Sequence, residues 1–238
     1  MLTDTQLGAA VVEVITLPLA FRSEDAAKYH SQKRRLREED GQQSNSLGLA
    51  VLKQPAVWFC SLYLLTYVGT ETSISGWIVI FMTRERHAST FIASLTSSGF
   101  WGGMAVGRLA LGAVTDKLGV KLAVIFYTLL TLTFAILFGV IRNDAVAVVM
   151  LSGLGFFCGP LFPSSIVLLT QVLPSQLHVS GVSFVASMGQ VGGTLMPFAL
   201  GMIVDVVGMA AFQAIFLLQL ATSLVVWIVY SKQASGAR

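Results

Sequence analysis

The chain has 238 residues, of which 55% are hydrophobic and 11% are charged, and its mean hydropathy is +0.76. Soluble domains carry about 25% charged residues, so this composition excludes an ordinary soluble domain and indicates a protein with several membrane spans. The net charge of +3 resides in the polar connections, where it reports membrane orientation rather than nucleic-acid binding.

The chain begins with a short apolar run, residues 7–21, which contains Glu13 and Pro18. This run is too short for a full span, and the N-terminus lacks the basic region of a cleavable signal peptide. We therefore expect residues 1–21 to be a partial transmembrane helix that belongs to the fold; the alternative is a segment that lies at the membrane interface. Residues 22–55 are polar and include a charged run at 33–40, so we expect a solvated linker there.

Six long apolar segments follow the linker, and each is long enough to cross a bilayer as a helix. The alternation typical of a membrane barrel is absent from the sequence. We therefore predict an all-α membrane protein with a six-helix transmembrane domain over residues 56–230 and a tail over residues 231–238. The predicted spans are Ala56–Met82, Phe91–Val114, Leu122–Ile141, Val146–Val172, Val179–Val207 and Met209–Tyr230.

Lysine and arginine are distributed unevenly between the two sides of these spans. Twelve of the 15 lie in the linker, at the connection between the second and third spans, and in the C-terminal tail. The other three, Arg84, Arg86 and Arg142, lie on the opposite side. By the positive-inside rule, the linker and the C-terminus face the cytosol, and the plasma membrane is the default location of a multi-pass protein of this kind.

The connection between the second and third spans is a charged passage set tightly between two apolar segments. Residues 107–121 read GRLALGAVTDKLGVK, and charges this dense place the passage at a membrane face. Gly119 is expected to form the turn there, because glycine tolerates a positive φ. Arg108 and Asp116 are eight residues apart, which predicts that they share one helix face; the alternative is that each pairs with a group on a neighbouring helix.

This passage resembles the signature loop of the major facilitator superfamily of secondary transporters. That pattern is Gly-x-x-x-Asp-x-x-Gly-x-Lys/Arg. Its positions here are Gly112, Asp116, Gly119 and Lys121, with Gly107 and Arg108 just upstream. The resemblance implies that the six spans form the C-terminal half of such a transporter, that residues 7–21 end the preceding helix, and that the N-terminal half is absent from this chain.

Three further segments are most similar to the fucose-permease-like branch of the superfamily, which includes many fungal members. They are Tyr67–Ile78, Gly159–Ile166 and Gly189–Phe198.

Glu71 lies near the middle of the first long span, far from both ends. A carboxylate there costs about 2.5–3.5 kcal/mol on insertion scales, so it faces a watery cavity, pairs with a cation or stays protonated. Tyr67 and Ser75 lie four residues to either side, on the same helix face. We predict that this stripe recognises a solute hydroxyl, couples transport to protons, or both. The alternative is a structural carboxylic acid that is hydrogen-bonded between helices.

The fifth span carries a second polar stripe. Its members follow one another in steps of four, three and four residues, which keeps them on one helix face: Ser183, Ser187, Gln190 and Thr194. Of these, Ser187, Gln190 and Thr194 are predicted to bind a polar solute such as a sugar. The alternative is hydrogen bonding between helices, at about 0.6 kcal/mol per bond.

Glycine and proline mark two further features of the spans. Pro160 and Pro163 are predicted to kink the fourth span, either as a gating element or because proline is simply common in membrane helices. Two small-residue patterns are predicted to allow close helix packing: Gly99, Gly103 and Gly107, and Gly189 with Gly193.

The sequence contains no nucleotide-binding loop, no nucleophile turn and no metal-ligand spacing, so we predict no enzyme, no catalytic residue, no metal and no cofactor. The resemblance implies secondary transport of a small polar solute, such as a sugar or a secondary metabolite, by alternating access, with proton symport as one option. The signature loop would latch the cytoplasmic side. The expected partners are the lipid bilayer, a small-molecule solute, and either a missing N-terminal half or a second copy, without nucleic acid. The alternative is a transport-incompetent half that acts as a regulatory or interaction protein.

Overall fold

The computed structural model describes residues 50–236; the partial helix expected over residues 1–21 and most of the expected linker lie outside the described residues. Residues 50–236 form helices and short connections, without a strand. The helices are α3 (Pro55–Arg84), α4 (Thr90–Ala110), α5 (Gly112–Leu118), α6 (Val120–Val140), α7 (Asp144–Cys158), α8 (Leu161–Val172), the 3-10 turn η1 (Ser175–Leu177), α9 (His178–Val207) and α10 (Ala211–Gly236). The all-α prediction is therefore confirmed.

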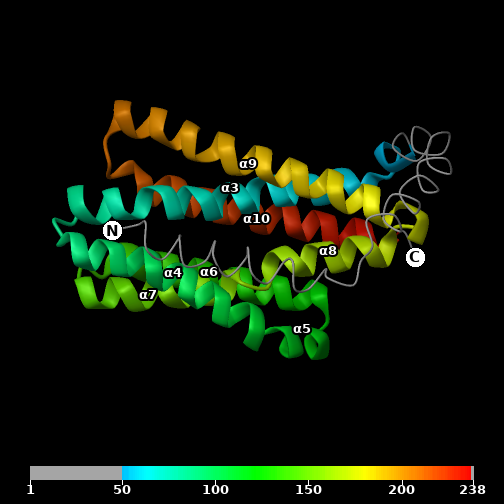
Figure 1. Cartoon of the computed structure of the whole chain (residues 1–238), viewed down its shortest axis with the longest axis horizontal. Coiled ribbons are helices and arrows are strands. Elements are labelled where there is room, and N and C mark those ends of the chain that lie inside the picture. Colours follow the sequence, from blue (N-terminus) through cyan, green and yellow to red (C-terminus); the bar gives the residue numbers. More distant parts are fainter. Residues whose placement is uncertain (1–49, 237–238) are drawn as a thin grey trace, which may run out of the picture. The chain divides into compact units, whose positions relative to one another are not determined.

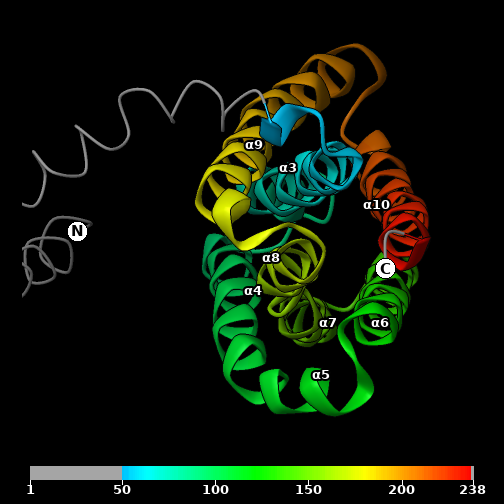
Figure 2. The ribbon, with the colours of Figure 1, turned by 90° about the vertical axis from the view of Figure 1, so that its right-hand side faces the viewer.

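The helices gather into two groups that share contacts through the centre of the bundle. In one group α3 packs along α9 and α10, and in the other α7 packs against α4 and α6. The view along the bundle in Figure 2 shows α3, α9 and α10 above, and α4, α6 and α7 below. The second half of the fourth predicted span, α8, contacts both α3 and α6, so it joins the two groups.

Five helical segments are long and apolar enough to cross a membrane, judged by length and composition: Pro55–Arg84, Val120–Val140, Asp144–Val172, Ser175–Val207 and Ala211–Ser235. The second predicted span, Phe91–Val114, corresponds to α4, which has 21 residues and already ends at Ala110. Helix α4 lies alongside α7 in the bundle (Figure 1). Because of its Ser, Thr and Gly residues, α4 is not among the five segments that are apolar enough by composition. The last span also differs from the prediction, because α10 continues past Tyr230 to Gly236.

The signature passage turns more sharply than the sequence suggested. A helix boundary at Leu111 separates α4 from α5, so the prediction that Arg108 and Asp116 share one continuous helix face is wrong. The chain then reverses at Gly119, whose φ is +80°. This is the left-handed conformation expected there, which glycine adopts without steric cost.

The fourth predicted span is interrupted at the predicted prolines. Helix α7 ends at Cys158, and α8 begins at Leu161 with Pro160 as its N-cap residue. Pro163 has no N–H, so the carbonyl of Gly159 has no helical donor four residues ahead. The break therefore leaves backbone acceptors that other helices can satisfy.

Glycines bring two helix pairs into backbone contact, as predicted for α4. A Cβ added at Gly103 or Gly107 would clash with the carbonyl oxygens of Ser152 and Phe156 on α7. Between α3 and α9 the closest approach is at Gly192, where a Cβ would clash with the Leu65 carbonyl oxygen. The predicted Gly193 is less crowded, with Val68 Cγ1 3.3 Å from an added Cβ.

Candidate solute site

A cavity of about 350 Å³ lies among α3, α4, α8 and α9. Its polar lining consists of Glu71, Arg108 and Gln190, and its apolar lining consists of Val68, Phe162 and Pro163. Glu71 and Gln190 were both predicted as solute-site residues, from two different helices. The structure adds Arg108, which sequence reasoning had placed in the gating passage.

Arg108 connects the cavity to the break between α7 and α8. Its Nε donates a hydrogen bond to the Gly159 carbonyl oxygen at 3.3 Å, the acceptor that Pro163 leaves without a helical donor. Its guanidinium also interacts electrostatically with Glu71. Arg108, near the end of α4, therefore interacts with both the Glu71 carboxylate and the break between α7 and α8.

Tyr67 lies one helical turn from Glu71 and is buried, with only 1% of its surface exposed, and its side chain interacts with that of Glu71. Its hydroxyl donates to the Cys158 carbonyl oxygen at 2.8 Å, and Cys158 is the last residue of α7. Tyr67 thus bonds to the same helix break as Arg108, and its ring stacks on that of Tyr63.

Ser75, one turn beyond Glu71, accepts a hydrogen bond from Trp101 Nε1 at 3.0 Å. Trp101 stands on α4 and is 43% exposed. Its position in the sequence does not distinguish this tryptophan from aromatic residues that face lipid. The structure connects it to the polar stripe of α3.

The polar residues of α9 lie along one exposed face, as predicted from their spacing. The Ser187 hydroxyl donates to the Ser183 carbonyl oxygen at 2.9 Å, and the Thr194 hydroxyl donates to the Gln190 carbonyl oxygen at 3.1 Å. These hydroxyls therefore bond within their own helix. Gln190 alone among the four lines the cavity.

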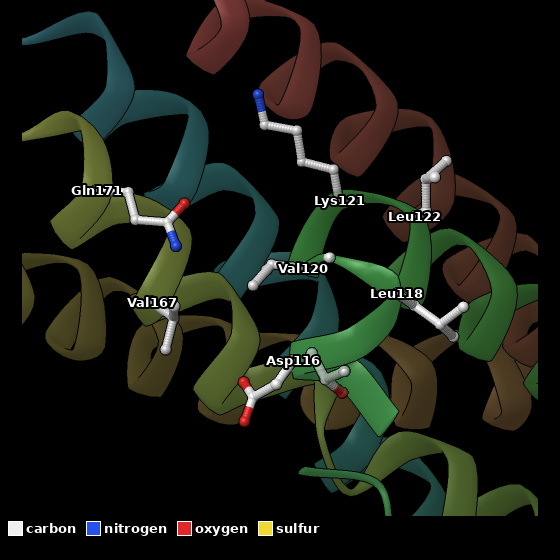
Figure 3. A pocket seen from close by; sticks show the side chains of 9 residues that line it. Asp116, Leu118, Val120, Lys121, Leu122, Val167 and Gln171 are labelled. Atoms are coloured by element: carbon white, nitrogen blue, oxygen red, sulfur yellow. The ribbon is translucent and has the colours of Figure 1, made fainter. Parts of the chain in front are cut away.

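The signature turn borders a second cavity of about 480 Å³ (Figure 3). Asp116 and Lys121 line it from the turn, and Val167 and Gln171 line it from α8. The Lys121 ammonium donates to Ser235 Oγ at 2.6 Å, so the turn is tied to the end of α10. Within residues 50–236, no three His, Cys, Asp or Glu side chains gather where they could hold a metal ion.

Comparison with known proteins places this architecture in a family. The family model described as Major Facilitator Superfamily matches residues 13–235. The chain therefore belongs to the Major Facilitator Superfamily, a superfamily of membrane transporters rather than enzymes.

Two curated relatives are longer than this chain. The chain is 29% identical over 251 residues to Bypass of stop codon protein 6 of Saccharomyces cerevisiae, in a match that covers 95% of the chain and 50% of that protein. It is 28% identical over 148 residues to a protein of Helicobacter pylori named Putative glucose/galactose transporter, in a match that covers 62% of the chain and 35% of that protein. The chain thus spans half or less of the relatives it matches.

Among solved structures, the chain resembles FucP, described as a Major Facilitator Superfamily transporter in the outward conformation. The TM-score is 0.66 at 16% sequence identity, and the match covers 77% of this chain and 44% of FucP. This similarity supports the fold. The fold is also the one expected for the predicted fucose-permease-like branch.

Proposed function

We propose that the bundle is the C-terminal half of a secondary transporter for a small polar solute, with a sugar as the first candidate. The observation that carries the proposal is the cavity that Glu71, Arg108 and Gln190 line together, with Glu71 half-buried and Arg108 and Gln190 exposed on helices that are otherwise largely apolar. A carboxylate accepts hydrogen bonds from hydroxyls, and guanidinium and amide groups donate to hydroxyl oxygens. The name of the Helicobacter pylori relative supports the same solute class.

The polar stripes around the cavity extend this site. Ser75, Ser187 and Thr194 are the proposed additional contacts to the solute as it moves along α3 and α9. Tyr67 has a positioning role, because its hydroxyl bonds to the helix break. The transport domain spans residues 56–230, the linker (22–55) and the tail (231–238) face the cytosol, and the plasma membrane is the proposed location.

The mechanism we propose couples Glu71 to the helix break through Arg108. While Glu71 is ionised, its charge attracts Arg108; when Glu71 is protonated or bound to the solute, the bond from Arg108 to Gly159 dominates. Proton symport would use this competition. The half would rock against an N-terminal half or a second copy, and the signature turn with Asp116 and Lys121 would latch the cytoplasmic side.

The test replaces Glu71 by Gln and measures binding and uptake of radiolabelled glucose and galactose in liposomes containing the full chain, with and without an inward proton gradient. We expect binding to weaken at least about tenfold and any stimulation by the gradient to disappear, because the amide has the size of the acid but cannot ionise. Asp205→Asn is the matched control, since Asp205 is an exposed carboxylate on α9 that does not line the cavity.

Three outcomes contradict parts of the proposal. Unchanged sugar binding in Glu71→Gln would remove Glu71 from the site. An absence of saturable sugar binding in the unmodified chain would reject the sugar. Binding without uptake would keep the site and reject transport by this chain alone.

A further inference from the structure

Trp101 is an exposed aromatic side chain close to the proposed solute site. It stands on α4, and 43% of its surface is exposed. A tryptophan on the outside of a membrane helix often faces lipid at the interface. The residues that share its helix face decide whether this one does.

Two different exposed stripes run along α4. One is apolar, as a surface in contact with lipid should be: Phe91, Leu95, Val106 and Leu109. The other combines small and polar residues with the indole: Ser94, Ser98, Trp101, Ala105 and Arg108. The members of the second stripe follow one another in steps of four, three, four and three residues, which keeps them on one helix face. Trp101 therefore lies on the polar face of α4, two turns from Arg108, which lines the solute cavity.

The polar face of α4 meets that of α3, against which α4 packs. The Trp101 indole N–H donates to Ser75 Oγ at 3.0 Å, and Arg108 interacts electrostatically with Glu71. Ser75 and Glu71 are one turn apart on α3, about 6 Å along the helix axis, so a solute at Glu71 has Trp101 within reach. The indole N–H lies in the plane of the ring, so its bond to Ser75 fixes the ring at its edge and does not use its π faces.

An aromatic face beside hydrogen-bonding groups suits one kind of solute. The face of an aromatic ring is electron-rich, so it attracts the weakly positive C–H groups that gather on one side of a pyranose ring. The hydroxyls of the same sugar point outward from its edge, where Glu71 can accept from them and Arg108 can donate to them. An open-chain polyol carries the same hydroxyls without a rigid C–H face.

From this arrangement we infer that Trp101 stacks on the ring of a pyranose and thereby selects cyclic sugars over open-chain polyols. Ser75 holds the indole in place for this contact. The inference rests on the proposed sugar site and specifies the form of sugar that the site takes.

The test measures binding of radiolabelled galactose to the purified full chain, with unlabelled galactose and galactitol as competitors. Galactitol has six hydroxyl-bearing carbons in an open chain, and we expect it to compete at least about tenfold less well than galactose. Trp101→Leu should weaken galactose binding about tenfold, because leucine fills space without a π face, and should change galactitol binding less than twofold. Trp58→Leu is the matched control, since Trp58 is 50% exposed on α3 and does not line the solute cavity, and it should leave both affinities unchanged.

A second variant separates the ring face from the indole N–H. Trp101→Phe keeps an aromatic face but cannot bond to Ser75, so we expect it to weaken galactose binding less than about threefold. The inference is overturned if Trp101→Leu binds galactose as tightly as the unmodified chain, or if it weakens galactose and galactitol equally. It is also overturned if Trp101→Phe loses as much affinity as Trp101→Leu, because the N–H bond would then be the important contact.

The same measurements separate this inference from the proposed function. Galactose binding that depends on Glu71 but not on Trp101 would reject the stacking and keep the sugar site. An absence of saturable galactose binding in the unmodified chain would reject both.

Discussion

At the scale of single residues, the helix break explains why two polar side chains from different helices point to one place. Pro163 leaves the Gly159 carbonyl without a helical donor, and the carbonyl of Cys158 ends α7. Arg108 and Tyr67 donate to these two oxygens. Both donors also lie close to Glu71. The Glu71 carboxylate and the break between α7 and α8 therefore interact with the same two side chains, Arg108 and Tyr67.

The role of Tyr67 can be tested by removing only its hydroxyl. Tyr67→Phe should lower the free energy of unfolding by about 1 kcal/mol, because the Cys158 carbonyl loses its donor, and should leave sugar affinity within about twofold. Tyr63→Phe is the matched control, since Tyr63 is equally buried but its hydroxyl has no partner within residues 50–236. Thermal unfolding in detergent measures the stability of both variants, and sugar binding measures their affinity. Equal losses of unfolding free energy in the two variants would show that the hydrogen bond to Cys158 has no special role. A large loss of sugar affinity in Tyr67→Phe would show that Tyr67 contacts the solute.

Sequence reasoning found Glu71 and Gln190 because polar groups deep in apolar spans stand out without any three-dimensional knowledge. It assigned Arg108 to gating alone, since the residue is part of the signature passage, residues 107–121. Its contact with the α7–α8 break depends on how α4 packs against α7, and spacing within one helix carries no information about that. The bond from Trp101 to Ser75 was missed for the same reason.

At the scale of helices, the packing of α4 on α7 depends on glycines at defined positions. Gly103→Ala should destabilise the bundle by about 1–3 kcal/mol, because its Cβ meets the Ser152 backbone, which cannot move aside as a side chain would. Gly102→Ala is the neighbouring control: an added Cβ there has no atom within 4 Å, so it should be neutral or slightly stabilising. Melting temperatures of the two variants in detergent give the comparison, and similar values would show that the close contact does not hold in solution.

The order of the long apolar helices in residues 50–236 could be predicted because apolar length is a property of the chain alone. The turn at Gly119 and the break at the prolines could also be predicted, since both follow from the backbone chemistry of single residues. The boundary at Leu111 could not, because no glycine or proline occupies that position. It could also not be predicted that α3 approaches α9 most closely at Gly192 rather than at Gly193, since this depends on the rotation of α9 against α3.

At the scale of the whole molecule, the distribution of cations predicts how the bundle lies in the membrane. Lys117 lies beside the signature turn and Arg84 at the end of α3, and both are exposed. The native Cys60 and Cys158 are buried, so they should react slowly with thiol reagents. In intact cells, a membrane-impermeant maleimide should label Arg84→Cys, and it should label Lys117→Cys only after the membrane is permeabilised. The reverse pattern would show the opposite orientation.

The bond between Trp101 and Ser75 has an optical consequence. The indole N–H groups of the other three tryptophans, Trp58, Trp77 and Trp227, donate to backbone carbonyl oxygens, which a solute cannot easily displace. Trp101 donates to a side-chain hydroxyl one turn from Glu71, so a solute that bonds to Ser75 changes the surroundings of this indole first. The protein therefore carries its own ultraviolet reporter, whose emission wavelength would follow the occupation of the polar stripe without any added dye.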